Sequence, residues 1–108
     1  MQDFRDKIAV ITGGASGIGL GIARAIASEG GHVVVADIDE TAAKAAADDL
    51  TSRGVRSLAV RCDVRDDASV DAVFDAAKVE FGGIDLLFNN AGVYLGGEMK
   101  DCTLDDWR

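Results

Sequence analysis

Hydrophobic positions along the chain follow two spacings, and their alternation predicts the order of strands and helices. Short runs of apolar and β-branched residues are typical of strands that are buried on both faces. The expected strands are residues 7–12, 32–37, 57–62 and 84–89. Between them, apolar residues recur at helical spacing. The expected helices are residues 17–29, 40–53 and 67–81. Glycines follow each helix and end it, at positions 30–31, 54 and 82–83.

Strands that alternate with helices of this length form βαβ units, in which consecutive strands are parallel. Right-handed crossovers then place helices on both faces of the sheet. The predicted fold class is therefore α/β, a doubly wound parallel sheet with the strand order 3-2-1-4. The winding reverses between strands 1 and 4, and ligands of such sheets bind there, outside the carboxyl ends of the strands.

A glycine-rich loop, TGGASGIG, lies at this edge between the first strand and the first helix. Gly13, Gly17 and Gly19 have the spacing G-x-x-x-G-x-G. Glycine adopts positive φ and has no Cβ to obstruct a ligand. The helix that begins near Gly17 directs free N–H groups and its positive dipole end at the loop. We expect an anion site suited to pyrophosphate; the alternative is a tight turn that binds nothing.

Two acids end the neighbouring strands. Asp37 comes 18 residues after Gly19 and can accept hydrogen bonds from the hydroxyls of an adenosine ribose. Its charge would repel a 2′-phosphate, and no basic residue is near it in the sequence, because Ile38 follows and Ala15 lies in the loop. We expect NAD to be preferred over NADP. Asp63 could accept from the adenine amino group. The alternatives are a solvated strand-end acid for Asp37 and a helix-leading acid for Asp63.

The fourth strand ends beside the first strand in a short polar segment, Asn89, Asn90, Ala91 and Gly92. Asparagine amides can tie neighbouring loop backbones together, and the small Ala91 and Gly92 let a ribose lie close. The alternative is a polar turn without a ligand. No strand is expected beyond this segment, so the outer edge of the fourth strand is expected to be bare.

Charge and composition narrow the possible functions. The net charge is −8, and both halves are acidic, with five basic and eight acidic residues in 1–54 and six and eleven in 55–108. No basic face is left for nucleic acid or for an anionic membrane. No apolar run reaches the ~18 residues of a membrane span, and a cytoplasmic protein of one domain is expected. Cys62 and Cys102 match no metal or redox spacing and are expected to be reduced packing residues.

Three segments together resemble the short-chain dehydrogenase/reductase family. TGGASGIG is similar to the TGxxxGIG cofactor loop of the family, Cys62-Asp63-Val64 to its acidic adenine-contact step, and IDLLFNNAG to its NNAG segment. The resemblance covers nearly the whole chain. It implies a Rossmann fold, a nicotinamide cofactor, which Asp37 would restrict to NAD, and hydride transfer between the nicotinamide and a small alcohol or ketone.

The resemblance also implies which residues contact the cofactor. Those that would line the pyrophosphate are Gly13, Ser16, Gly17, Ile18 and Gly19. Those that would hold the adenosine are Asp37 and Ile38 at the ribose and Asp63 and Val64 at the adenine. Those that would lie toward the nicotinamide are Asn90, Ala91 and Gly92. Thr12 and Asn89 would mainly brace the loops.

The catalytic groups of the family are not found in these 108 residues. In the family a Ser, a Tyr-x-x-x-Lys and an Asn carry the catalysis, and the Tyr is the general acid/base. Here the only tyrosine, Tyr94, is followed four residues later by Glu98, and a carboxylate would raise the pKa of a phenol. We therefore assign no catalytic residue. Thr103 to Asp106 resembles a helix start with a capping box, which two further residues cannot complete as a turn.

We therefore expect residues 1–108 to be the N-terminal, NAD-binding part of a longer dehydrogenase, or a truncated form of one, and to be inactive alone. The alternative is a non-catalytic nucleotide-binding module that associates with another chain through its bare sheet edge. Self-association into a homo-oligomer is expected in either case, and no metal site is expected.

Overall fold

One sheet flanked by three helices makes up the part of the chain that the computed structural model describes, residues 4–15, 17–89 and 92–95. The strands are β1 (Ile8–Thr12), β2 (His32–Asp37), β3 (Ser57–Arg61), β4 (Leu86–Asn89) and β5 (Gly92–Leu95). The helices are α1 (Gly17–Ser28), α2 (Glu40–Ser52) and α3 (Asp67–Phe81). The sheet has the order β3-β2-β1-β4-β5, and β1 to β4 are parallel. The predicted fold class and strand order are confirmed.

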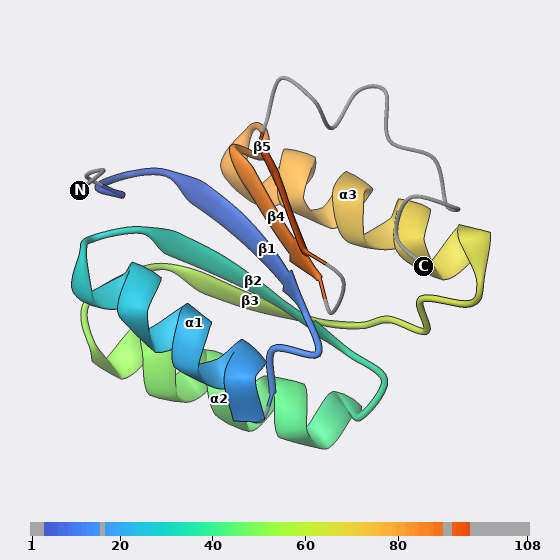
Figure 1. The fold of residues 1–108 in the computed structure, drawn as a ribbon, viewed down its shortest axis with the longest axis horizontal. Coiled ribbons are helices and arrows are strands. Elements are labelled where there is room, and N and C mark those ends of the chain that lie inside the picture. Colours follow the sequence, from blue (N-terminus) through green and yellow to red (C-terminus); the bar gives the residue numbers. More distant parts are fainter. Residues whose placement is uncertain (1–3, 16, 90–91, 96–108) are drawn as a thin grey trace.

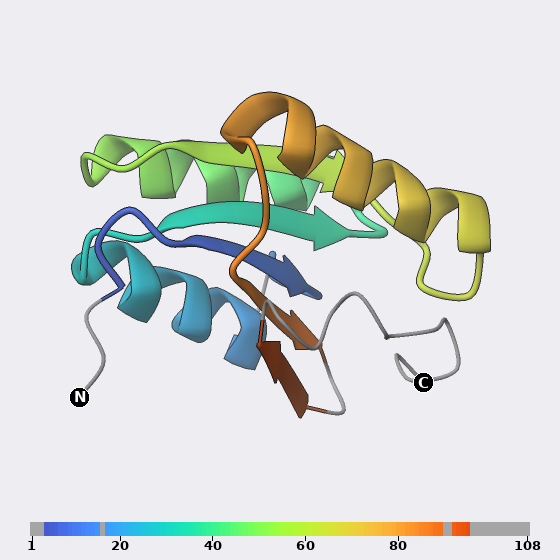
Figure 2. The same ribbon diagram turned by 90° about the horizontal axis from the view of Figure 1, so that it is seen from above.

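The two faces of the sheet carry different helices. Figure 1 shows α1 and α2 along one face and α3 along the other, and Figure 2 shows the same arrangement from above. Because successive residues of a strand point to opposite faces, Ala9 and Ile11 of β1 pack toward α1 and α2, whereas Val10 packs toward α3. Both faces of the central strands are therefore apolar, which explains why their sequences show no polar alternation.

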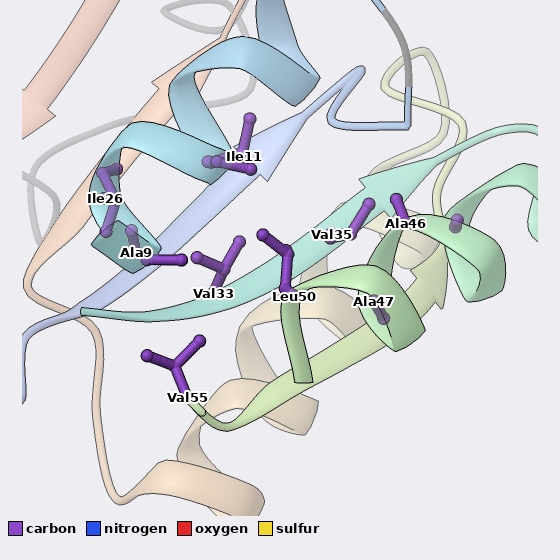
Figure 3. Close-up of a cluster of buried hydrophobic side chains, with 12 residues drawn as sticks. Ala9, Ile11, Ile26, Val33, Val35, Ala46, Ala47, Leu50 and Val55 are labelled. Carbon is purple, nitrogen blue, oxygen red and sulfur yellow. The ribbon is translucent and has the colours of Figure 1, made fainter. Parts of the chain in front are cut away.

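The core under α1 and α2 consists of aliphatic side chains directed toward one another (Figure 3). Ile26 of α1 and Leu50 of α2 meet Val33 and Val35 of β2, and each of these is at most 2% exposed. Full burial of such a side chain stabilises the fold by about 1.5–3 kcal/mol. This packing fixes α1 against the sheet, and with it the place of its N-terminus beside the end of β1.

The outer edge of β4 is not bare, and the sequence-based expectation is wrong on this point. β5 pairs with β4 in antiparallel orientation, from Leu86 opposite Leu95 to Asn89 opposite Gly92. Gly92, expected in a turn, is the first residue of β5. The run that follows it, Val-Tyr-Leu, has high strand propensity but is too short to show alternation. The edge on which the alternative of self-association rested is therefore occupied in this chain.

Truncation of a core residue tests the packing that positions α1 and α2. Leu50→Ala should lower the free energy of unfolding by about 2–5 kcal/mol, because it removes a buried side chain and leaves a cavity. Val79→Ala is the control, since Val79 of α3 is 87% exposed, and should change stability by less than about 0.5 kcal/mol. Urea denaturation measures both. Equal effects of the two substitutions would contradict the described core.

Candidate functional site

The glycine-rich loop between β1 and α1 is held to the end of β2 by two hydrogen bonds. The Gly13 N–H donates to the Ala36 carbonyl oxygen at 2.8 Å. Two residues later, the Ala15 N–H donates to Oδ2 of Asp37 at 3.2 Å. Gly13 has a φ of 64°, a conformation that glycine adopts without strain. The loop therefore lies against β2 before any ligand is considered.

On its other side the start of the loop is tied to β4. The hydroxyl of Thr12 donates to the Phe88 carbonyl oxygen at 3.4 Å, and Thr12 is buried. A buried hydroxyl needs such a partner. Thr12 is the last residue of β1. The contact therefore lies at the carboxyl end of β1, where the strand order reverses between β2 on one side and β4 on the other. The predicted bracing role of Thr12 is consistent with this contact.

The first turn of α1 packs directly on the loop. A Cβ on Gly19 would overlap the carbonyl group of Gly13 and lie 3.0 Å from Cα of Gly14. Gly17 differs, because it has a φ of 58° and a Cβ there would meet nothing within 4 Å. The first turn of α1 carries no acid, so its positive dipole end and free N–H groups are not neutralised by its own side chains. The arrangement fits a phosphate group approaching from the side of Gly17.

The carboxylate of Asp37 is directed at the loop rather than away from it. Its Oδ2 accepts from the Ala15 N–H at 3.2 Å, and its Oδ1 accepts from the Asp39 N–H at 3.0 Å. A carboxylate has about four lone-pair positions, so about two are left after these bonds. Asp37 can therefore accept from the two hydroxyls of a ribose without releasing the loop.

A basic residue that sequence reasoning missed lies beside Asp37. Arg61 is the register partner of Asp37 across β2 and β3, and its side chain is exposed. Alternation along the strands places both residues on the face of α1 and α2, because Val35 and Ala59 pack there. Asp37 was expected to have no basic neighbour because none is close to it in the sequence. The pairing of β2 with β3 brings Arg61 beside it. Only the register of β2 and β3 could have revealed it.

Asp63, the candidate adenine contact, is paired with an arginine. Its Oδ1 accepts from the backbone N–H and from Nε of Arg65, and its Oδ2 from Nη2, each at 3.0 Å. These hydrogen bonds lower the pKa of Asp63 from 3.8 to about 2, and the charge of Arg61 adds to the effect. The Asp63 N–H donates to Oγ of Ser69 at 2.9 Å. An adenine amino group would have to share this carboxylate with Arg65 or displace it.

Two large aliphatic side chains are exposed around the loop. Ile18, at the start of α1, is 84% exposed, and Ile38, directly after β2, is 52% exposed. Val64 is half-buried, and part of it packs against the α3 core. Water contact with such side chains is unfavourable, so a ligand that covers Ile18 and Ile38 would gain from their burial.

Several sequence-based expectations fall on residues outside the described ranges. These are the roles of Ser16, Asn90, Ala91, Glu98 and Cys102, and the helix start at Thr103. Cys62 is described and is 3% exposed within the α3 core, where burial raises the pKa of its thiol. Its predicted packing role is confirmed.

The described residues form neither a metal site nor a membrane-spanning helix. Within residues 4–15, 17–89 and 92–95, no three His, Cys, Asp or Glu side chains gather as metal ligands. None of the helices in those ranges has the length and apolar content to cross a membrane.

The sequence of the chain is similar to those of known dehydrogenases. A family model described as short chain dehydrogenase matches residues 7–108. Galactitol 2-dehydrogenase of Agrobacterium fabrum is 49% identical over 91 residues, which cover 84% of this chain and 34% of that protein.

Two solved structures resemble the chain, each with a TM-score of 0.78 and 45% identity. One is a short chain dehydrogenase/reductase from Burkholderia phymatum in complex with NAD, with 82% of this chain and 32% of that chain covered. The other is L-sorbose reductase from Gluconobacter frateurii complexed with NADPH and L-sorbose, with 84% and 36% covered. The chain spans about a third of the length of these proteins.

The packing of α1 on the loop can be tested with two glycines of the same helix. Gly19→Ala should lower the free energy of unfolding by about 1–3 kcal/mol, because its methyl group collides with the Gly13 carbonyl. Gly21→Ala is the matched control. A Cβ there meets nothing within 4 Å, so the higher helix propensity of alanine should raise stability by about 0.5–1 kcal/mol. Thermal or urea denaturation distinguishes them; effects of the same sign would contradict the described contact.

The Asp63–Arg65 pair gives a prediction for the pKa of Asp63. The carboxylate stays charged in the folded chain at pH values where the unfolded chain binds a proton. Its contribution to stability is therefore present above pH ~4 and is lost as the pH falls toward 2. Arg65→Ala should raise the pKa of Asp63 toward 3.8, measured by an NMR titration of the carboxyl carbon. Arg53→Ala, which removes a partner of Asp49 instead, should leave this pKa unchanged. An Asp63 pKa that stays near 2 in Arg65→Ala would exclude the arginine as its cause.

Proposed function

The chain belongs to the short chain dehydrogenase family, and we propose that it binds a nicotinamide adenine dinucleotide, NAD in preference to NADP. The pyrophosphate would be held by main-chain N–H groups of the glycine-rich loop and of the first turn of α1. The adenosine ribose would be held by Asp37. Ile38 and Val64 would lie along the adenosine, and Asn90, Ala91 and Gly92 would lie toward the nicotinamide.

One observation carries this proposal: the Asp37 carboxylate lies on the glycine-rich loop itself, 3.2 Å from the Ala15 N–H. A ligand whose phosphates contact the loop therefore meets this carboxylate with its next group, which in NAD is the adenosine ribose. The lone pairs that remain on Asp37 match two ribose hydroxyls. A 2′-phosphate in the same place would bring negative charge against a carboxylate, which supports NAD over NADP.

The reaction that we propose for the whole protein is hydride transfer between the nicotinamide and an alcohol or ketone. The cofactor supplies the hydride chemistry, and the residues described above would bind it and orient it. The relatives named for galactitol and L-sorbose support a small hydroxyl-bearing substrate. We propose that the groups that move the proton lie outside residues 1–108, so that this chain supplies the dinucleotide-binding part. A homo-oligomeric state and a cytoplasmic location stay predictions.

Cofactor titration tests the proposal. NADH should bind the chain more tightly than NADPH, measured by calorimetry or by the fluorescence of the reduced nicotinamide. Asp37→Ala should weaken NADH by about 10- to 100-fold, because hydrogen bonds to a charged group are lost. Asp48→Ala, which removes an exposed acid of α2, is the control of equal charge change and should leave the affinity unchanged.

Three outcomes would contradict the proposal. Tighter binding of NADPH than of NADH would overturn the role given to Asp37. Absence of binding of either cofactor would overturn the function of the loop. Turnover of an alcohol by the purified 108-residue chain would show that proton-transfer groups lie within it.

A further inference from the structure

The contacts of Asp37 join three separate segments of the chain. Asp37 is the last residue of β2, Ala15 belongs to the glycine-rich loop, and Asp39 is the N-cap of α2. Oδ2 accepts from the loop, and Oδ1 accepts from the N-cap residue. Asp39 in turn accepts from the Ala42 N–H at 3.0 Å. These bonds join parts of the chain to one another, so Asp37 has a structural role in addition to any contact with a ligand.

We propose that Asp37 is a positioning residue for the glycine-rich loop: its carboxylate holds the loop in its binding conformation before the cofactor arrives. The ribose site and the pyrophosphate site would then be one coupled unit rather than two independent contacts. The identity of the ligand in this statement rests on the proposed function. The holding of the loop does not, because the hydrogen bonds that hold it are made within the chain.

A carboxylate meets this requirement better than the other side chains of its size. Both of its neighbours are N–H donors, so each oxygen has to accept. An asparagine offers one carbonyl oxygen and an NH2 group that only donates, so it could satisfy Ala15 or Asp39 but not both. An alanine would satisfy neither. The charge of Asp37 also strengthens both hydrogen bonds relative to a neutral acceptor.

The described loop has few other attachments to β2. The Gly13 N–H donates to the Ala36 carbonyl, a bond between main-chain atoms that no substitution of Asp37 removes. Ala15 lies beyond it, toward α1, and its N–H donates to the Asp37 side chain. Glycine-rich backbone has many accessible conformations in the free state. Loss of the Asp37 carboxylate should therefore free the part of the loop that faces the phosphates while the Gly13 end stays fixed.

This coupling predicts an unusual response to substitution. If Asp37 acted only by repelling a 2′-phosphate, Asp37→Ala would raise the affinity for NADPH. If Asp37 positions the loop, both cofactors lose a preformed phosphate site, and the affinities for NADH and NADPH both fall. A change of cofactor preference would then need a new acceptor for the Ala15 N–H, although Arg61 already places a cation beside this position.

Amide hydrogen exchange of the free 108-residue chain, followed by NMR without any cofactor, tests the positioning role. We expect the Ala15 amide to be protected in the wild-type chain and to exchange at least 10-fold faster in Asp37→Ala. The Gly13 amide, bonded to a main-chain carbonyl, and the Val34 amide in the middle of β2 should keep their protection, which shows that the fold is intact. Asp48→Ala is the matched control and should leave Ala15 protected.

A second variant keeps the test decisive if Asp37→Ala does not fold. Asp37→Asn should accelerate exchange at one of the two amides, Ala15 or Asp39, and leave the other protected. Equal exchange of Ala15 in the wild-type chain and in both variants would overturn the proposal, as would a rise in NADPH affinity in Asp37→Ala. Failure of the wild-type chain to bind either cofactor would overturn the proposed function alone, because the exchange experiment contains no cofactor.

Discussion

The contact between the glycine-rich loop and the end of β2 is the constraint on which the rest of the site depends. It consists of one main-chain bond, from Gly13 to Ala36, and one bond to a side chain, from Ala15 to Asp37. On the other side of the loop, the first turn of α1 can pack closely because Gly19 has no Cβ to overlap the Gly13 carbonyl. The apolar packing of α1 and α2 on the sheet then keeps the helix N-terminus directed at the same place. Hydrogen bonds thus position the loop, and apolar packing positions the N-terminus of α1 beside it.

Features that depend on local backbone requirements could be predicted from the sequence. The strand and helix order follows from apolar spacing, and α3 has the predicted bounds. The loop could be located because glycines are needed where φ is positive or where helix and loop touch, and both conditions are met, at Gly13 and at Gly19. The position of Asp37 followed from its place at the end of a strand. Each of these inferences uses only residues that are close together in the chain.

Features that depend on pairing or on side-chain conformation could not be predicted. Arg61 is brought beside Asp37 by the register of β2 and β3, which apolar spacing does not specify. The pairing of Asp63 with Arg65 depends on the rotamer of a long exposed side chain. β5 was missed because four residues are too few for a periodic signal. As a result, Asp37 and Asp63, which look alike in the sequence, differ in the structure: Asp37 accepts from backbone N–H groups, whereas Asp63 is also paired with the guanidinium of Arg65.

The partners of β1 on its two sides also differ in their separation from β1 in the sequence. Ile8 pairs with His32, 24 residues later, whereas its N–H donates to Oδ2 of Asp85 across 77 residues. Closing the longer loop costs about 1 kcal/mol more in chain entropy. Both bonds between the glycine-rich loop and β2 are made within the first 37 residues. The groups that tie the loop to β2 are therefore all synthesised before β4, whose Phe88 carbonyl later accepts from Thr12 at the start of the loop.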